Sequence, residues 1–203
     1  MSAQLPHLVW LGKEKYELSG SSDVLPFDPK EYNLKPAAPH PKCWRGYVCQ
    51  FRVEEETLFL DRLEVNDASK SIKRREQLVN EKKPSKNSKR VFRFMSKWGA
   101  VYFNKTYRKV KLPLSFSGQW LLTRGGVWDQ HAHYAMHPAW RYKEIHLLKF
   151  EAGRLVFHQD LGDLMARIRN EVERLEHQGK DFSEIHKWVR EQFDDEKFEQ
   201  LML

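Results

Sequence analysis

Apolar and polar positions alternate most regularly between residues 43 and 65, which read CWRGYVCQFRVEEETLFLDRLEV. From Tyr47 to Val53, every second residue is aromatic, apolar or cysteine. A period of two with aromatic and β-branched residues is typical of a strand. Three glutamates then form a polar turn, and an apolar run returns after them. The segment therefore predicts a β-hairpin.

Weaker versions of this pattern occur on both sides of the hairpin. HLVWLGKEKYEL predicts two short strands around Gly12, and residues 19–43, rich in Ser and Pro, predict an extended connector. Apolar and aromatic runs between residues 91 and 126 predict further strands. EIHLLKFEAGRLVFHQD predicts a second hairpin, with its turn at residues 151–153.

The pattern changes to a three-and-four spacing after residue 160, which is typical of an amphipathic helix. The apolar positions of this first helix are Leu161, Leu164, Met165, Ile168, Val172 and Leu175. We expect Asp160 to cap its start, Asp163 to lie in its first turn and Gly179 to end it.

A second helix is expected after Asp181, which forms a capping pair with Glu184. Its apolar stripe is predicted to consist of Phe182, Ile185, Val189 and Phe193, with Trp188 beside it.

Strands followed by helices indicate an α+β protein with a mostly antiparallel sheet and two C-terminal amphipathic helices. We expect a β-rich part over residues 1–158, with a basic loop inserted at about residues 66–90. A helical tail over residues 159–203 is expected to pack on it, giving a single domain overall.

The charge of the chain is concentrated in its centre. The formal net charge is +7 and the pI about 9.3. Residues 70–111 contain 15 Lys and Arg against only Glu76 and Glu81, a net charge of +13. This asymmetry indicates a polyanionic partner or an intramolecular match with the acidic C-terminal region.

Aromatic residues interleave with these cations in KRVFRFMSKWGAVYFNKTYRKVK. Cations bind phosphates and aromatic faces stack on bases, so the mixture suits single-stranded nucleic acid. Alternatively, the aromatic residues belong to the core, the lysines form a solvated face, or an acidic protein is the partner. The expected contact residues are Lys82, Lys83, Lys86, Lys89, Arg90, Arg93, Lys97 and Trp98.

Asp129, His131 and His133 stand two residues apart, so on a strand they would share one face. Two imidazoles and a carboxylate are plausible ligands for zinc or iron. The stretch partly resembles the first motif of the cupin family, with Gly125 at the expected distance before His131. The resemblance implies a further ligand, and His146 or His158 is a candidate.

The same histidines have other interpretations. His146 falls into the alternation of a strand, where histidine is usually a hydrogen-bonded structural residue. A metal-free nuclease could instead use His131 and His133 as acid and base with Arg141 and Lys143. Motifs of phosphate loops, dinucleotide sites and serine hydrolases are absent from the sequence.

The two cysteines, Cys43 and Cys49, are six residues apart. On one strand they would share a face but lie too far apart to form a disulfide. We therefore expect reduced thiols in a cytoplasmic protein. Cys49, in the middle of a strand pattern, is expected to be an inert core residue. No apolar run is long enough to span a membrane, and we expect no membrane association.

The hairpin CWRGYVCQFRVEEETLFLDRLEV, the later PLSFSGQWLLTRGG and the early PFDPKEYNLKP resemble a group of uncharacterised bacterial proteins. These proteins share a Cys-x-Arg-Gly-Tyr strand, a following hairpin and a Ser-Gly-x-x-Leu strand. The resemblance covers about a third of the chain. It implies a bacterial, cytoplasmic, β-rich protein and no particular reaction.

The sequence thus predicts a non-enzymatic bacterial accessory protein, without a cofactor, that binds nucleic acid or a nucleoprotein assembly through its basic centre. One alternative is a protein–protein interaction module of the immunity or adaptor type, which would use the C-terminal helices. Another is a hydrolase or nuclease, either metal-dependent or based on histidine, centred on residues 129–133.

Overall fold

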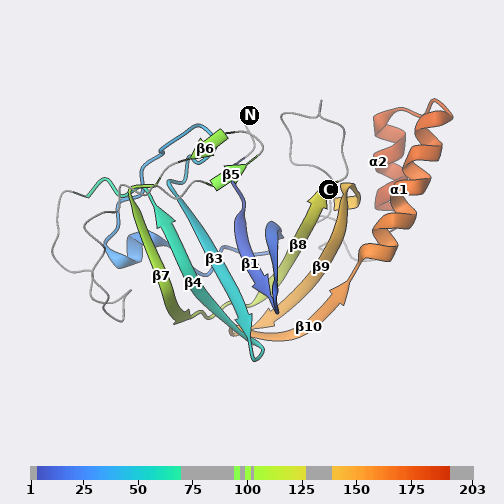
Figure 1. Cartoon of the computed structure of the whole chain (residues 1–203). Coiled ribbons are helices and arrows are strands. Elements are labelled where there is room, and N and C mark those ends of the chain that lie inside the picture. Colours follow the sequence, from blue (N-terminus) through green and yellow to red (C-terminus); the bar gives the residue numbers. More distant parts are fainter. Residues whose placement is uncertain (1–3, 70–93, 97–98, 102, 127–138, 193–203) are drawn as a thin grey trace.

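The computed structural model describes residues 4–69, 94–96, 99–101, 103–126 and 139–192. Its main element is a curved sheet of eight strands. A separate hairpin of two short strands precedes β7 (Figure 1). The strands of the large sheet are β1 (His7–Leu11), β2 (Glu14–Ser21), β3 (Tyr47–Glu54), β4 (Thr57–Val65), β7 (Lys105–Pro113), β8 (Gly118–Gly126), β9 (Tyr142–Glu151) and β10 (Arg154–Asp160). The short hairpin consists of β5 (Phe94–Ser96) and β6 (Gly99–Val101).

The strand order is β10-β9-β8-β2-β1-β3-β4-β7. Every neighbouring pair is antiparallel except β1 and β3, which are parallel. With two helices after this sheet, the α+β class is confirmed. Both predicted hairpins are also confirmed, as are the two strands around Gly12. The connector is shorter than expected, because β2 extends to Ser21 and a 3₁₀ turn occupies Pro29–Tyr32.

The sheet curls until the starts of β10 and β4 meet, where Arg154 pairs with Thr57 (Figure 1). The turn between β9 and β10 is fixed at this junction. The Gly153 amide donates to the Phe116 carbonyl at 2.8 Å, and the Gly153 carbonyl accepts from the Leu58 amide at 2.9 Å. The β10 and β4 strands therefore come together at this point, and the sheet curves around the side chains on its inner face.

The inner face of the curve holds the main core. Trp120 is fully buried and contacts Phe51, Phe116 and Phe150, with ring centroids 5.0–5.2 Å away from Trp120. Aromatic side chains of this size bury large apolar areas, so a few of them can stabilise a curved sheet. Cys49 belongs to this core, whereas Cys43 precedes β3 and packs in a separate small cluster. The two cysteines therefore do not lie on one strand, which was the condition for their sharing a face.

The two helices are α1 (Gly162–His177) and α2 (Phe182–Arg190), and α1 contacts β9 (Figure 1). Met165, Ile168 and Val172 of α1 pack with Ile185 and Val189 of α2 in a second core, to which Ile145 and Leu147 of β9 contribute. The buried residues of the two predicted apolar stripes therefore pack together beside β9. No helix in these ranges is long and apolar enough to cross a membrane.

The helix ends confirm some of the capping predictions. Asp181 and Glu184 form a complete capping box. The residue that caps α1 is Leu161 rather than Asp160, although Asp160 accepts a bond from the Gly162 amide at 2.8 Å. Phe182 is the first residue of α2 and is 71% exposed, so it is not part of the buried apolar stripe. The predicted position of Phe193 lies outside the described residues.

Candidate functional site

Most residues that the sequence nominates lie outside the described part of the chain. This holds for the predicted metal ligands Asp129, His131 and His133, which remain candidates. It also holds for the predicted nucleic-acid contacts Lys82, Lys83, Lys86, Lys89, Arg90, Arg93, Lys97 and Trp98. Within the described ranges, no three His, Cys, Asp or Glu side chains are grouped so that they could hold a metal ion.

The described part of the basic centre is β7, at one edge of the sheet. Arg108, Lys109 and Lys111 are exposed there. Lys109 and Lys111 have φ values of 55° and 49°, in the left-handed region, where the strand bulges against β4. Such a bulge prevents the edge from pairing with another strand, so the lysines face solvent instead.

The face of β1, β3 and β4 opposite the Trp120 core carries a second group of cations and aromatic rings. We call it the outer face. Trp10 on β1 pairs in register with Lys15 on β2 and with Arg52 on β3, and Arg52 pairs with Phe59 on β4. Residues paired across strands point to the same side of a sheet. One row across four strands therefore consists of Lys15, Trp10, Arg52 and Phe59. The sequence pattern does not predict this row.

Trp10 lies between the two cations of this row. The Lys15 Nζ is 5.6 Å and the Arg52 guanidinium carbon 5.2 Å from the centre of the indole ring. Both distances are within the range of a cation–π interaction. Arg52 also approaches Asp61 at 3.8 Å, and both side chains are partly exposed. The row is therefore accessible at the surface and preorganised around an aromatic ring.

A second row on the outer face lies next to the first. Gln50 on β3 pairs with Arg62 on β4, and Arg62 pairs with Arg108 on β7. Arg62 forms an ion pair with the buried Glu64. Burial raises the pKa of Glu64, and it lowers the pKa of Arg62 while the neighbouring charge of Arg108 adds to the lowering. This second row thus places Arg62 and Arg108 side by side, next to the row that contains Trp10.

Helices α1 and α2 do not lie over this face. They lie beside β9, whereas β3, β4 and β7 form the opposite side of the molecule (Figure 1). From β2 to β7 the outer face spans four inter-strand spacings, roughly 19 Å. Part of this face is covered, because Val48, Gln50 and Glu64 are buried. Its accessible part is the row that contains Trp10, Arg52 and Phe59.

A different polar cluster occupies the inner face at the ends of β2, β8, β9 and β10. The Tyr16 hydroxyl lies 3.1 Å from His146 Nε2, and His146 Nδ1 lies 3.1 Å from His158 Nε2. Burial lowers the pKa of His146 and raises that of Tyr16. His146 is thus a hydrogen-bonded strand residue, as its alternation predicts. Its partners Tyr16 and His158 were not foreseen.

The cluster continues through charged groups. The Tyr16 hydroxyl donates to Glu144 Oε2 at 3.4 Å, and Glu144 accepts two bonds from Arg124 at 2.9 and 2.6 Å. Arg124 also pairs with Glu14 and lies 5.0 Å from the Tyr16 ring centre. The arginine is therefore already neutralised by two carboxylates and is a poor anion-binding group.

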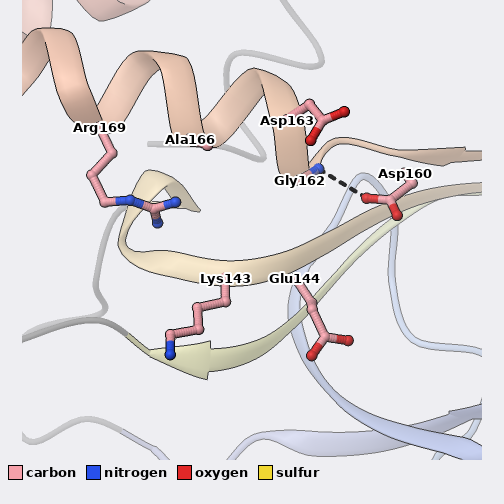
Figure 2. A pocket seen from close by; sticks show the side chains of 7 residues that line it. All are labelled: Lys143, Glu144, Asp160, Gly162, Asp163, Ala166 and Arg169. Atoms are coloured by element: carbon pink, nitrogen blue, oxygen red, sulfur yellow. Dashed lines mark hydrogen bonds between the residues drawn. The ribbon is translucent and has the colours of Figure 1, made fainter.

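A hollow of about 440 Å³ adjoins this cluster, between β9, the end of β10 and α1 (Figure 2). Lys143 and Arg169 line it together with Glu144, Asp160 and Asp163. Arg169 donates to the carbonyls of Trp140 and Tyr142. The two basic side chains lie on one side of the hollow and the three carboxylates on the other (Figure 2). The lining is thus mostly charged, unlike the mostly apolar lining of a typical ligand pocket. Arg141, the other predicted acid–base partner, ends the 3₁₀ turn before β9.

The thiol of Cys49 is unsuited to nucleophilic catalysis. It is fully buried, and burial raises its pKa far above the usual range. Its backbone amide donates to Nδ1 of the buried His7, whose own pKa is lowered well below the usual value by burial and by Arg45. The imidazole and the thiol are both neutral, and the thiolate is the nucleophilic form of cysteine. The two residues are therefore structural rather than catalytic.

Comparisons with protein-family models, with curated proteins and with solved structures found no match to this chain.

Proposed function

We propose that this chain is a non-enzymatic protein that binds single-stranded nucleic acid across the outer face of its sheet. The observation that carries the proposal is the position of Trp10 between Lys15 and Arg52, with Phe59 next in the same row. This is a mixture of aromatic faces and cations at the surface of a sheet, as in proteins that stack unpaired bases on strands.

The aromatic row favours single strands over duplexes. In a duplex the base faces are already stacked and cannot reach a ring on a sheet, whereas an unpaired base can. A base stacking on Trp10 would displace Lys15 or Arg52 from one face of the indole. The displaced cation would then lie beside the phosphate of the same nucleotide.

Exposed cations lie at both ends of the outer face. Lys15 lies on β2, and Arg108, Lys109 and Lys111 lie on β7. None of these four forms an ion pair with a carboxylate in the described part of the chain. Their charge is therefore available to phosphates, whose neutralisation releases counterions and supplies most of the affinity.

The strongly basic segment fits the same surface through its place in the chain. Residues 70–93 follow β4 and precede the β5–β6 hairpin, which leads into β7; β4 and β7 are the two strands at this edge of the sheet. Lys82, Lys86 and Arg90 are the kind of residues that would continue the cationic track beyond β7. We include the segment in the proposed interface on the basis of its sequence and its connection to these strands.

The experiment is an anisotropy titration with labelled single-stranded and double-stranded DNA and RNA over a range of salt concentrations. For the wild type, we expect single strands to bind more tightly than duplexes, with a steep dependence on salt. Trp10→Ala should weaken single-strand binding by about 5- to 160-fold, because one base stack contributes about 1–3 kcal/mol. Lys111→Ala should reduce the salt slope by about 0.7, the value for one phosphate contact on a single strand.

Arg174→Ala is the matched control, because Arg174 is an exposed arginine on α1 paired only with the neighbouring Glu171. It should leave both affinity and salt slope unchanged. Equal affinity for single strands and duplexes, or unchanged binding by Trp10→Ala, would refute the proposed face. Reversal of four charges among residues 82–97 tests the basic segment separately.

A protein partner at the C-terminal helices remains the alternative. The apolar faces of α1 and α2 are buried against β9, so such a partner would contact their polar faces and the exposed Phe182. Absence of any nucleic-acid binding at low salt, together with specific capture of one protein that is lost in Phe182→Asp, would favour this alternative.

A further inference from the structure

The hollow between β9 and α1 is lined by opposite charges that do not pair with one another. Lys143 and Arg169 lie on one side of it, and Glu144, Asp160 and Asp163 lie on the other (Figure 2). Within the described part of the chain, neither cation forms an ion pair with any of these carboxylates. Opposite charges held apart across an open space can be bridged by a molecule that carries both.

The walls of the hollow are fixed by close contacts between α1 and β9 at both of its ends. At one end, a Cβ atom added to Gly162 would lie only 3.5 Å from the Lys143 carbonyl oxygen. At the other end, Arg169 donates to the carbonyls of Trp140 and Tyr142 at 2.9 and 3.0 Å. The hollow is therefore set by the packing of the helix on the strand.

Two small residues of α1 provide the space between these ends. Gly162 and Ala166 are four residues apart, and Arg169 follows three residues later, so all three lie on one face of the helix. This face lines the hollow, whose volume is about 440 Å³. A larger side chain at position 166 would therefore fill part of the space.

Arg169 presents an unused edge of its guanidinium group. Both of its bonds to backbone carbonyls come from the same nitrogen, Nη1. Among the described residues, its Nε and Nη2 atoms have no bonded partner, and their N–H groups point in parallel from one edge of the guanidinium plane. Two such parallel donors match the two oxygens of a carboxylate. Arg169 is thus held in place by the backbone in a form suited to bind a carboxylate.

The opposite side of the hollow keeps carboxylate oxygens available. Asp160 accepts a bond from the Gly162 amide at Oδ1, and Glu144 accepts bonds from its neighbours at Oε2. Asp163 is exposed in the first turn of α1, without a bonded partner in the described ranges. An ammonium group has three donors and no acceptor, so it suits a set of carboxylate oxygens.

We propose that the hollow is a binding site for a small zwitterion, a molecule with a carboxylate at one end and an ammonium group at the other. Arg169 and Lys143 bind its carboxylate, and Glu144, Asp160 and Asp163 bind its ammonium group. The mostly charged lining, which is unsuited to an apolar ligand, is what such a molecule requires. The site is separate from the outer face of the sheet and does not rest on the proposed nucleic-acid binding.

The test is an NMR titration of the full chain, followed through its backbone amides. The probes are three zwitterions of increasing length: glycine, 4-aminobutanoate and 6-aminohexanoate. Each is compared with two matched molecules that keep only its carboxylate or only its ammonium group. The best zwitterion should shift the amide signals of Lys143, Gly162 and Ala166. It should bind about tenfold or more tightly than either matched molecule, because its second charged end binds intramolecularly.

Two substitutions at exposed side chains remove one charge from each side of the hollow. Lys143→Gln and Asp163→Asn should each weaken binding of the best zwitterion by about three- to tenfold, through loss of one hydrogen-bonding charge. Lys149→Gln on the same strand and Glu173→Gln on the same helix are the matched controls, because both side chains are exposed and lie outside the hollow. The controls should leave binding unchanged.

Ala166→Leu tests the space rather than the charge. It keeps every charged group and introduces a good helix former, and it should abolish binding by filling the hollow. Equally tight binding of a matched carboxylate or a matched ammonium compound would overturn the proposal, because the site would then recognise only one charge. Absence of any shift with all three zwitterions, or binding that neither Lys143→Gln nor Asp163→Asn weakens, would also overturn it.

Discussion

The turn between β9 and β10 provides a sharp test of how the sheet closes. Gly153 has a φ of 84°, and a Cβ atom added to it would lie 1.9 Å from the Leu114 carbonyl oxygen. A carbonyl oxygen of the backbone cannot move aside as a flexible side chain can. Gly153→Ala therefore forces the turn away from the segment that precedes β8.

The expected loss of stability has two parts. An alanine in the left-handed region costs about 1–2 kcal/mol. Displacement of the turn also weakens its bonds to Phe116 and Leu58, and leaving buried backbone groups without partners costs about 1–3 kcal/mol. We therefore expect Gly153→Ala to lower the free energy of unfolding by about 2–5 kcal/mol.

Gly12→Ala is the matched control, because Gly12 also lies in a hairpin turn with a positive φ of 61° but has nothing within 4 Å of an added Cβ. It should lose only the backbone cost, about 1–2 kcal/mol. Urea unfolding followed by tryptophan fluorescence measures both values. Equal losses in the two variants would refute the close packing of the β9–β10 turn.

Three further predictions concern the core, a helix cap and a buried acid, each measured by urea unfolding. Trp120→Ala should destabilise the protein by about 3–5 kcal/mol, because Trp120 is fully buried among three phenylalanines. Asp181→Ala should cost about 1 kcal/mol through loss of the capping box. Burial raises the pKa of Asp67, but hydrogen bonds, first that from Lys105, outweigh it and hold the pKa well below its usual range. Asp67→Asn should therefore destabilise at pH 7, and its difference from the wild type should shrink as pH falls below about 4.

The elements that depend on local pattern could be predicted from the sequence. The alternation from Tyr47 to Val53 and the turn glycine Gly153 were sufficient to predict the two hairpins. The three-and-four spacing after residue 160 was sufficient for α1, and the Asp181–Glu184 pair for the start of α2. These features depend on residues within a few positions of one another, where backbone geometry dictates the pattern.

The arrangement of the sites could not be predicted in the same way. The row formed by Trp10, Arg52 and Phe59 depends on the parallel pairing of β1 with β3, and the contact between Tyr16 and His146 joins residues 130 positions apart. No local pattern specifies register across strands that are distant in sequence. The exposure of Phe182 was missed because apolar character alone does not specify which side of a helix end faces the sheet.

Photo-crosslinking tests the central claim most directly. The full chain is irradiated with a single-stranded oligonucleotide that carries 5-bromouridine, and the cross-linked peptides are identified by mass spectrometry. The outer-face account predicts cross-links in the peptides that contain Trp10 and Phe59, competed by unlabelled single strands more effectively than by duplex. Cross-links confined to Trp98 and its neighbours, or to α1 and α2, would contradict it.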